Sequence, residues 1–275
     1  MKFHKISIYY SSLNQCQIKG RYWKEPRDPV DWQTAGKEMI DKNLEILEKS
    51  KEWFRNTIAI NHIGNTKKLI KSSEFNINPF LAVYLANFLT GNSSALSIAK
   101  ALVYPRVLGT SITTSFGTNA QRFTNDVLDA FGSTTPGVDI EFIDQIDHKK
   151  KYCQLKSGPN TLNKDDVETI AGHFRTATNL ARTNNLQVSR DNMVVGVIYG
   201  ETGELSGHYK RIIAQYDYQV YVGKDFWHRL TGDDKFYEKL ITAIGSIAAE
   251  ADYSSELDEV INQLSEQDDI RNLSQ

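Results

Sequence analysis

The stretch GVDIEFIDQIDHKKKYCQLKSG, residues 137–158, contains two short apolar-rich runs on either side of a polar turn. This pattern predicts a β-hairpin with strands over residues 138–143 and 152–156. Side chains along a strand point to alternate faces, so one face of the hairpin is apolar. The opposite face collects four polar side chains: Asp139, Glu141, Gln154 and Lys156.

The position of the turn decides which of these side chains face one another. With residues 147 and 148 at its centre, Asp139 lies opposite Lys156, and Glu141 lies opposite Gln154. The grouping on one face does not depend on this register, because the parity within each strand is fixed.

Such a group of polar side chains suits metal-assisted hydrolysis of a phosphodiester. A hard cation such as Mg²⁺ prefers oxygen ligands, which Asp139 with Glu141 or Gln154 can supply. The main-chain carbonyl of Leu155 adds a further oxygen. Lys156 can then hold the attacking water and stabilise negative charge in the transition state. The alternative is an ordinary solvent-facing surface, since cross-strand polar pairs contribute only ~0.2–1 kcal/mol each.

The residues after the hairpin predict an α/β core. Asn163 is a suitable N-cap for a helix over residues 164–183, and the apolar run at 193–199 predicts a strand buried on both faces. The hairpin strand, this helix and this strand form one crossover in a mixed sheet. Further elements are predicted as a helix over 203–216, a strand over 218–223 and a helix over 234–251.

The chain divides into three parts by pattern. Residues 1–110 are predicted to be mainly helical, residues 111–249 form the core, and residues 250–275 form an acidic helix or tail. In the core, the helix before the hairpin is predicted between Gly117 and Gly132.

Composition and charge exclude few classes of protein. The chain has 275 residues and a net charge of −2, but the first 110 residues carry 16 Lys and Arg against 9 Asp and Glu. A local cationic face of this kind can contact nucleic acid although the total charge is near zero. Neither a signal peptide nor a membrane span is predicted, and Cys16 and Cys153 form no disulfide framework or metal-ligand spacing, so we expect a cytoplasmic protein.

Four stretches in order along the chain resemble one known family. The hairpin, with Asp139 before the triplet Gln154-Leu155-Lys156, resembles the PD-(D/E)xK nuclease superfamily. Within it, the chain is similar to type II restriction endonucleases that cut sites of the form purine-GG-N-CC-pyrimidine. The supporting stretches are INPFLAVYLANFL, TSITTSFGTNAQRF, GVDIEFID with YCQLKSGPNTLNKDD, and YQVYVGKDFWHRLTGD.

The resemblance implies a restriction-endonuclease-like core and a Mg²⁺-dependent active site. Asp139, Gln154 and Lys156 take the catalytic positions, and Gln121 matches a supporting position on the preceding helix. The sequence departs from the family pattern at Gln154, where a carboxylate is usual, and Pro136 lies three residues before Asp139. An amide can bind a metal ion through its oxygen but carries no negative charge. Glu141 is therefore the candidate to supply the missing negative charge.

Double-stranded DNA is the implied substrate, and a homodimer matches the symmetry of a palindromic site. The helical first part is expected to form the dimer contact and part of the DNA clamp, and a companion DNA methyltransferase is expected in the same system. Candidate contacts to the DNA backbone are Thr113, Thr114, Ser115, Lys149, Lys150 and Lys164.

Three other functions remain open on the sequence. Glutamine in the triplet also occurs in nucleases of transposition, repair or modified DNA. An inactive nuclease fold that only binds DNA is a second possibility. A general α/β scaffold with a solvated hairpin face is the third.

Overall fold

A computed structural model describes residues 32–274, with the exception of residues 186 and 252. The side chains of residues 32–39, 110, 111, 120, 121 and 130 lie outside that description. The chain divides into two units, Met1–Glu38 and Met39–Gln275, and only the start of helix α1 (Trp32–Trp53) is described in the first. None of the described helices is both long and apolar enough to cross a bilayer.

A four-stranded mixed sheet forms the centre of the larger unit. Its strands follow the order β1 (Ile140–Ile143), β2 (Lys150–Lys156), β3 (Met193–Val197) and β4 (Gln219–Val222). β1 and β2 are antiparallel, whereas β2, β3 and β4 are parallel. Helix α6 (Lys164–Thr183) connects β2 to β3, which confirms the predicted crossover and the α/β fold class.

The register of the hairpin differs from the prediction by two residues. Ile140 pairs with Cys153 and Glu141 pairs with Tyr152, so the expected pairing of Glu141 with Gln154 and of Asp139 with Lys156 is wrong. The reason lies in the turn, where the Asp144 carboxylate accepts hydrogen bonds from the main-chain N–H groups of residues 146 and 147. This local bonding moves the centre of the turn toward β1.

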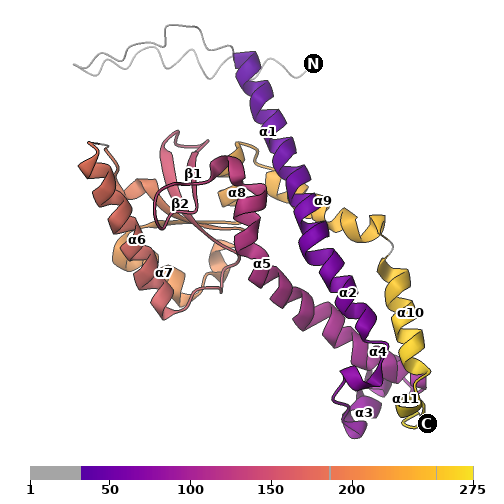
Figure 1. Ribbon diagram of the computed structural model, residues 1–275. Coiled ribbons are helices and arrows are strands. Elements are labelled where there is room, and N and C mark those ends of the chain that lie inside the picture. Colours follow the sequence, from indigo (N-terminus) through magenta and orange to yellow (C-terminus); the bar gives the residue numbers. More distant parts are fainter. Residues whose placement is uncertain (1–31, 186, 252, 275) are drawn as a thin grey trace. The chain divides into compact units, whose positions relative to one another are not determined.

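Helices cover both faces of the sheet. Helices α6 and α7 (Gly207–Tyr216) lie on one face (Figure 1). Phe174 and Tyr209 pack there in one cluster with Val195 and its neighbours. The opposite face packs against α5 (Ile112–Val127), α8 (Lys224–Thr231) and α9 (Phe236–Glu250). The buried residues of that face include Ile140, Phe142, Cys153, Val194, Phe123, Phe226 and Trp227.

The helix before the hairpin begins earlier than predicted and ends earlier, at Val127 instead of near Gly132. A π-helical turn, Arg106–Ser111, follows α4 (Ala95–Pro105), and α5 then begins at Ile112 and continues through Gly117. The hydroxyl-rich stretch at 109–117 is therefore helical and does not form a loop.

A separate group of helices forms its own apolar cluster. It contains α2 (Ile60–Lys68), α3 (Pro79–Thr90), α4, α10 (Tyr253–Ser265) and α11 (Asp268–Arg271). Val260, Ile261 and Leu264 of the acidic C-terminal segment are buried in this cluster, so that segment is packed rather than frayed. The remaining short elements are Phe54–Ala59, Ser72–Glu74, Asp129–Phe131, Arg190–Asn192 and Thr202–Glu204.

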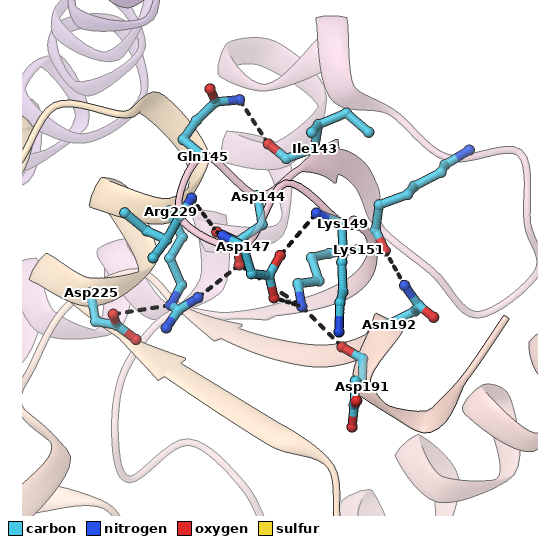
Figure 2. A network of polar contacts seen from close by, with 12 residues as sticks. Ile143, Asp144, Gln145, Asp147, Lys149, Lys151, Asp191, Asn192, Asp225 and Arg229 are labelled. Atoms are coloured by element: carbon cyan, nitrogen blue, oxygen red, sulfur yellow. Dashed lines mark hydrogen bonds and ion pairs between the residues drawn. The ribbon is translucent and has the colours of Figure 1, made fainter. Parts of the chain in front are cut away.

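A charged network joins the hairpin turn to α8 (Figure 2). Asp144 is fully buried and accepts a hydrogen bond of 2.9 Å from Arg229 of α8. Lys151 is also buried; its ammonium donates to Asp147 at 2.6 Å and to the Asp191 carbonyl at 3.1 Å. The network fixes the end of the hairpin that lies away from Asp139.

Arg229→Met is expected to lower the free energy of unfolding by about 3 kcal/mol, because it leaves the buried Asp144 carboxylate without its closest cation. Arg211→Met is the matched control, since it breaks a 3.5 Å pair with the exposed Glu168 and should cost less than about 1 kcal/mol. Urea unfolding of both variants measures the difference. Equal losses would show that the network does not stabilise the turn.

Candidate active site

A cavity of about 510 Å³ lies where the end of β2 meets α5 and α6. It contains Asp139, Gln154 and Lys156, three of the four polar side chains grouped by the sequence pattern. Its wall is completed by Gly117, Thr124, Asn125, Ser133, Gly137, Val138, Leu155, Ser157, Thr161, His173 and Ile198.

Asp139 is held at the start of the hairpin by main-chain bonds. Its N–H donates to the Cys153 carbonyl at 2.9 Å, and its carboxylate accepts the Leu155 N–H at 2.7 Å. Burial raises the pKa of this carboxyl group, although the Leu155 N–H and the nearby Lys156 act in the opposite direction. The site therefore holds a carboxylate that has lost part of its hydration and would gain from a cation.

The raised pKa of Asp139 predicts a specific pH dependence of stability. The protonated carboxyl favours the folded state, so its contribution is complete below the ordinary pKa of about 3.9 and is lost as the pH rises through the raised value. In metal-free protein, the melting temperature of wild type should therefore fall, relative to that of Asp139→Asn, from about pH 4 upward. Calorimetric melts of both proteins at several pH values test this, and parallel curves would contradict it.

Gln154 has both ends of its amide in defined surroundings. Its Nε2 donates to the Gly137 carbonyl at 2.6 Å and lies 2.8 Å from Nδ1 of His173. Its Oε1 is buried and has no hydrogen-bond partner among the described residues. A buried acceptor without a donor costs about 1–3 kcal/mol, so this atom fits a ligand that the protein itself does not provide.

Glu141 does not line the cavity. One carboxylate oxygen accepts hydrogen bonds from Ser133 at 2.6 Å and Thr135 at 2.9 Å, and the other pairs with Lys150 at 2.6 Å. Partial burial raises the pKa of Glu141, but the hydrogen bonds from Lys150, Ser133 and Thr135 outweigh this and lower it. The expectation that Glu141 completes the charge beside Asp139 is therefore not met by this geometry, because the two-residue change in register places Glu141 opposite Tyr152.

Lys156 is the last residue of β2 and its half-buried side chain lines the cavity. Within the described chain, no carboxylate lies within ion-pair distance of its ammonium group, although its charge acts on Asp139. Its ammonium is thus available to bind an anionic group in the cavity.

The candidate DNA contacts are not among the described residues of the cavity wall. Gln121 belongs to α5, but its side chain is among those not described. Lys150 is engaged by Glu141, Lys149 lines a different hollow with Arg182, and Lys164 is exposed at the first turn of α6. Thr113, Thr114 and Ser115 lie in the first turns of α5, where the two threonines are exposed.

His173 is the main site residue that sequence reasoning did not select. It lies on α6, next to the buried positions Ile170 and Phe174, and reaches the cavity from there. The helical pattern gives one signal, since a histidine directly beside an apolar stripe lies at the edge of the packed face. The pattern does not show what this histidine contacts.

The oxygen atoms in the cavity fit a hard cation. In the part of the chain that the structure describes, no three His, Cys, Asp or Glu side chains gather as metal ligands. The cavity instead combines one carboxylate, of Asp139, with the unpartnered amide oxygen of Gln154 and the adjacent main chain of Leu155. Carboxylate, amide and carbonyl oxygens are the ligands that Mg²⁺ and Ca²⁺ accept.

Comparison with protein families identifies the chain. The model of the family described as type II restriction endonuclease EcoO109I matches residues 93–252. The chain belongs to this family. The match runs from the residues before α4 to the end of α9, so it includes every residue of the cavity.

Membership of the EcoO109I family confirms the coarser prediction, that of a restriction endonuclease. It also agrees with the mixed sheet and the helical region observed here. A search of curated proteins finds no match to the chain.

Proposed function

We propose that the protein is a Mg²⁺-dependent type II endonuclease that hydrolyses double-stranded DNA at a short palindromic site. The observation that carries this proposal is the unpartnered Oε1 of Gln154, buried in the same cavity as the Asp139 carboxylate and Lys156. The EcoO109I family supplies the class of substrate.

Each residue has a separate role in this proposal. The Asp139 carboxylate, Gln154 Oε1 and the Leu155 carbonyl would hold the cation. When bound, the cation supplies charge stabilisation at the phosphoryl group and lowers the pKa of a water. Lys156 orients the attacking water and stabilises the charge that develops on the phosphate oxygens. Gln121 is proposed as an outer group on α5 that orients a water, as in related nucleases.

Contacts to the DNA backbone are proposed next to the cavity. Thr113, Thr114 and Ser115 lie on α5, the helix that also supplies Gly117 to the cavity wall. Lys164 follows the cavity residue Thr161 and begins α6. Lys149 and Lys150 lie at the other end of β2, about 20 Å from Lys156 at ~3.3 Å per residue, so they would contact a more distant part of the duplex.

A homodimer is supported by the exposed apolar face of α3. Phe80 is 87% exposed and Phe88 is 79% exposed, and Tyr84 lies between them on the same face. Leu81, Leu85 and Leu89 are also exposed along this helix. Contiguous apolar surface of this kind commonly marks a protein interface. A twofold protein in turn matches a twofold DNA site, with one strand cut by each subunit.

Phe80→Asp combined with Phe88→Asp is expected to convert the dimer to a monomer and to lower double-strand cleavage at least about 10-fold, because two charges enter the proposed interface. Light scattering after size-exclusion chromatography measures the mass. Ile213→Asp is the control, since Ile213 is 43% exposed on α7 and should leave the dimer intact. A wild-type monomer, or a dimeric double variant, would contradict the proposed interface.

The sequence specificity is tested by mapping the cut ends. Digestion of a fully sequenced, unmethylated phage DNA with Mg²⁺ should place every end at one short palindromic sequence. Ends scattered over many sequences would instead indicate a repair or other nonspecific nuclease. A DNA methyltransferase gene beside the gene of this protein is expected, and its product should block cleavage at the same sequence.

A further inference from the structure

Both hydrogens of the Gln154 amide are directed by the surrounding structure. The Gly137 carbonyl can only accept a hydrogen bond, so the amide atom 2.6 Å from it must be the nitrogen. The second amide hydrogen points to Nδ1 of His173 at 2.8 Å. His173 must therefore accept at Nδ1 and carry its proton on Nε2.

The contact between α6 and the hairpin depends on a glycine. Gly137 has φ +77°, and a Cβ atom built there would lie 2.4 Å from Cγ of His173. A side chain at position 137 would thus displace the imidazole. The absence of a side chain at 137 allows the Gly137 carbonyl and the His173 ring to contact the same amide from two directions.

We propose that His173 is a positioning residue that fixes the amide of Gln154 with its oxygen toward the cation site. This inference rests on the proposed function, in which Gln154 Oε1 is a metal ligand. A carboxylate can present either of two equivalent oxygens, whereas an amide must present its oxygen and not its NH₂ group. The family pattern has a carboxylate at this position, so the exchange for glutamine creates a need for a group that orients it.

The Gly137 carbonyl disfavours the reversed amide, and Nδ1 of His173 stabilises the observed one. Rotation by 180° would place Oε1 against the Gly137 carbonyl, which has no proton to donate, and against Nδ1 of His173, to which the ring proton would then have to move from Nε2. Rotation would also turn the NH₂ group toward the place of the cation. Groups that orient a metal ligand typically change metal affinity 10–100-fold when they are removed, so His173 should have an effect of this size.

A matched pair of variants separates hydrogen bonding from packing. His173→Asn keeps an acceptor attached to Cγ, in the place of Nδ1, whereas His173→Leu has nearly the same shape without an acceptor. Calorimetric titration with Mn²⁺ in the absence of DNA measures metal binding, and the melting temperature shows whether each variant is folded. We expect about 10–100-fold weaker Mn²⁺ binding for His173→Leu and a change of less than about threefold for His173→Asn.

Equal Mn²⁺ affinity of the folded Asn and Leu variants would overturn the proposal, because the acceptor would then be irrelevant. Failure of the proposed function gives a different pattern. In that case wild type itself does not bind Mn²⁺, or Asp139→Asn binds it as tightly as wild type. Weak binding by the Leu variant, rescued in the Asn variant, supports both the cation site and the positioning role.

Discussion

Lys156→Ala is expected to lower the rate of DNA cleavage by about 1,000-fold while DNA binding changes less than about threefold. The ammonium group lines the cavity without a carboxylate within ion-pair distance among the described residues, so its removal takes away a positive charge that would act beside the metal ion on the developing phosphate charge. Single-turnover cleavage of a duplex containing the mapped site measures the rate, and fluorescence anisotropy measures binding.

Lys210→Ala is the control for this variant. Lys210 is exposed on α7, away from the cavity wall, and its loss should leave the rate within about twofold of wild type. If Lys156→Ala still cleaved DNA at the wild-type rate, Lys156 would have no catalytic role. An equal loss of binding would assign it to DNA contact instead.

Asp139→Asn is expected to abolish Mn²⁺ binding and to lower cleavage by at least about 1,000-fold. An asparagine oxygen can still accept the Leu155 N–H, so the hairpin should keep its structure. Asp139 supplies the only carboxylate among the described residues of the cavity wall. Its replacement by asparagine therefore removes the negative charge that attracts the cation. Calorimetric Mn²⁺ titration and the same single-turnover assay measure the two effects.

Glu141→Gln provides the matched comparison for this second prediction. Glu141 is two residues away on the same strand face, but it is bonded to Ser133, Thr135 and Lys150 outside the cavity wall. Its exchange should change cleavage less than about fivefold. If Glu141→Gln lowered cleavage as much as Asp139→Asn does, Glu141 would have to be a metal ligand. That result would contradict its position outside the cavity wall.

The sequence predicted the elements of the core because their signals are local. The helix over 164–183 begins at its predicted cap, where the Asn163 side chain accepts from the N–H groups of residues 165 and 166. The alternating pattern of the hairpin placed Asp139, Gln154 and Lys156 on one face, and the cavity contains all three. Periodicity alone is sufficient for conclusions of this kind.

The hairpin register could not be predicted because distant residues stabilise the turn. Asp144 caps the turn, and it is buried there by Arg229, which follows 85 residues later in the chain. Without that contact, a turn centred one residue later is equally reasonable. The register then decided the place of Glu141, which the sequence had grouped with the metal ligands.

The proposed role of His173 and the exposure of α3 could not be predicted from the sequence for a related reason. An apolar helix such as PFLAVYLANFLT is predicted readily, but periodicity does not show that Phe80 and Phe88 remain exposed. In the same way, the stripe of α6 does not show that its neighbouring histidine meets Gln154. Both facts depend on which elements pack together.

A single digest distinguishes a Mg²⁺-dependent, site-specific nuclease from the other functions. Wild type and Lys156→Ala are incubated with sequenced, unmethylated phage DNA, each with Mg²⁺ and with EDTA, and the products are separated on a gel. We expect discrete fragments for wild type with Mg²⁺ and intact DNA in the other three lanes. Intact DNA with wild type across several divalent cations, or discrete fragments in EDTA or with Lys156→Ala, would contradict this expectation.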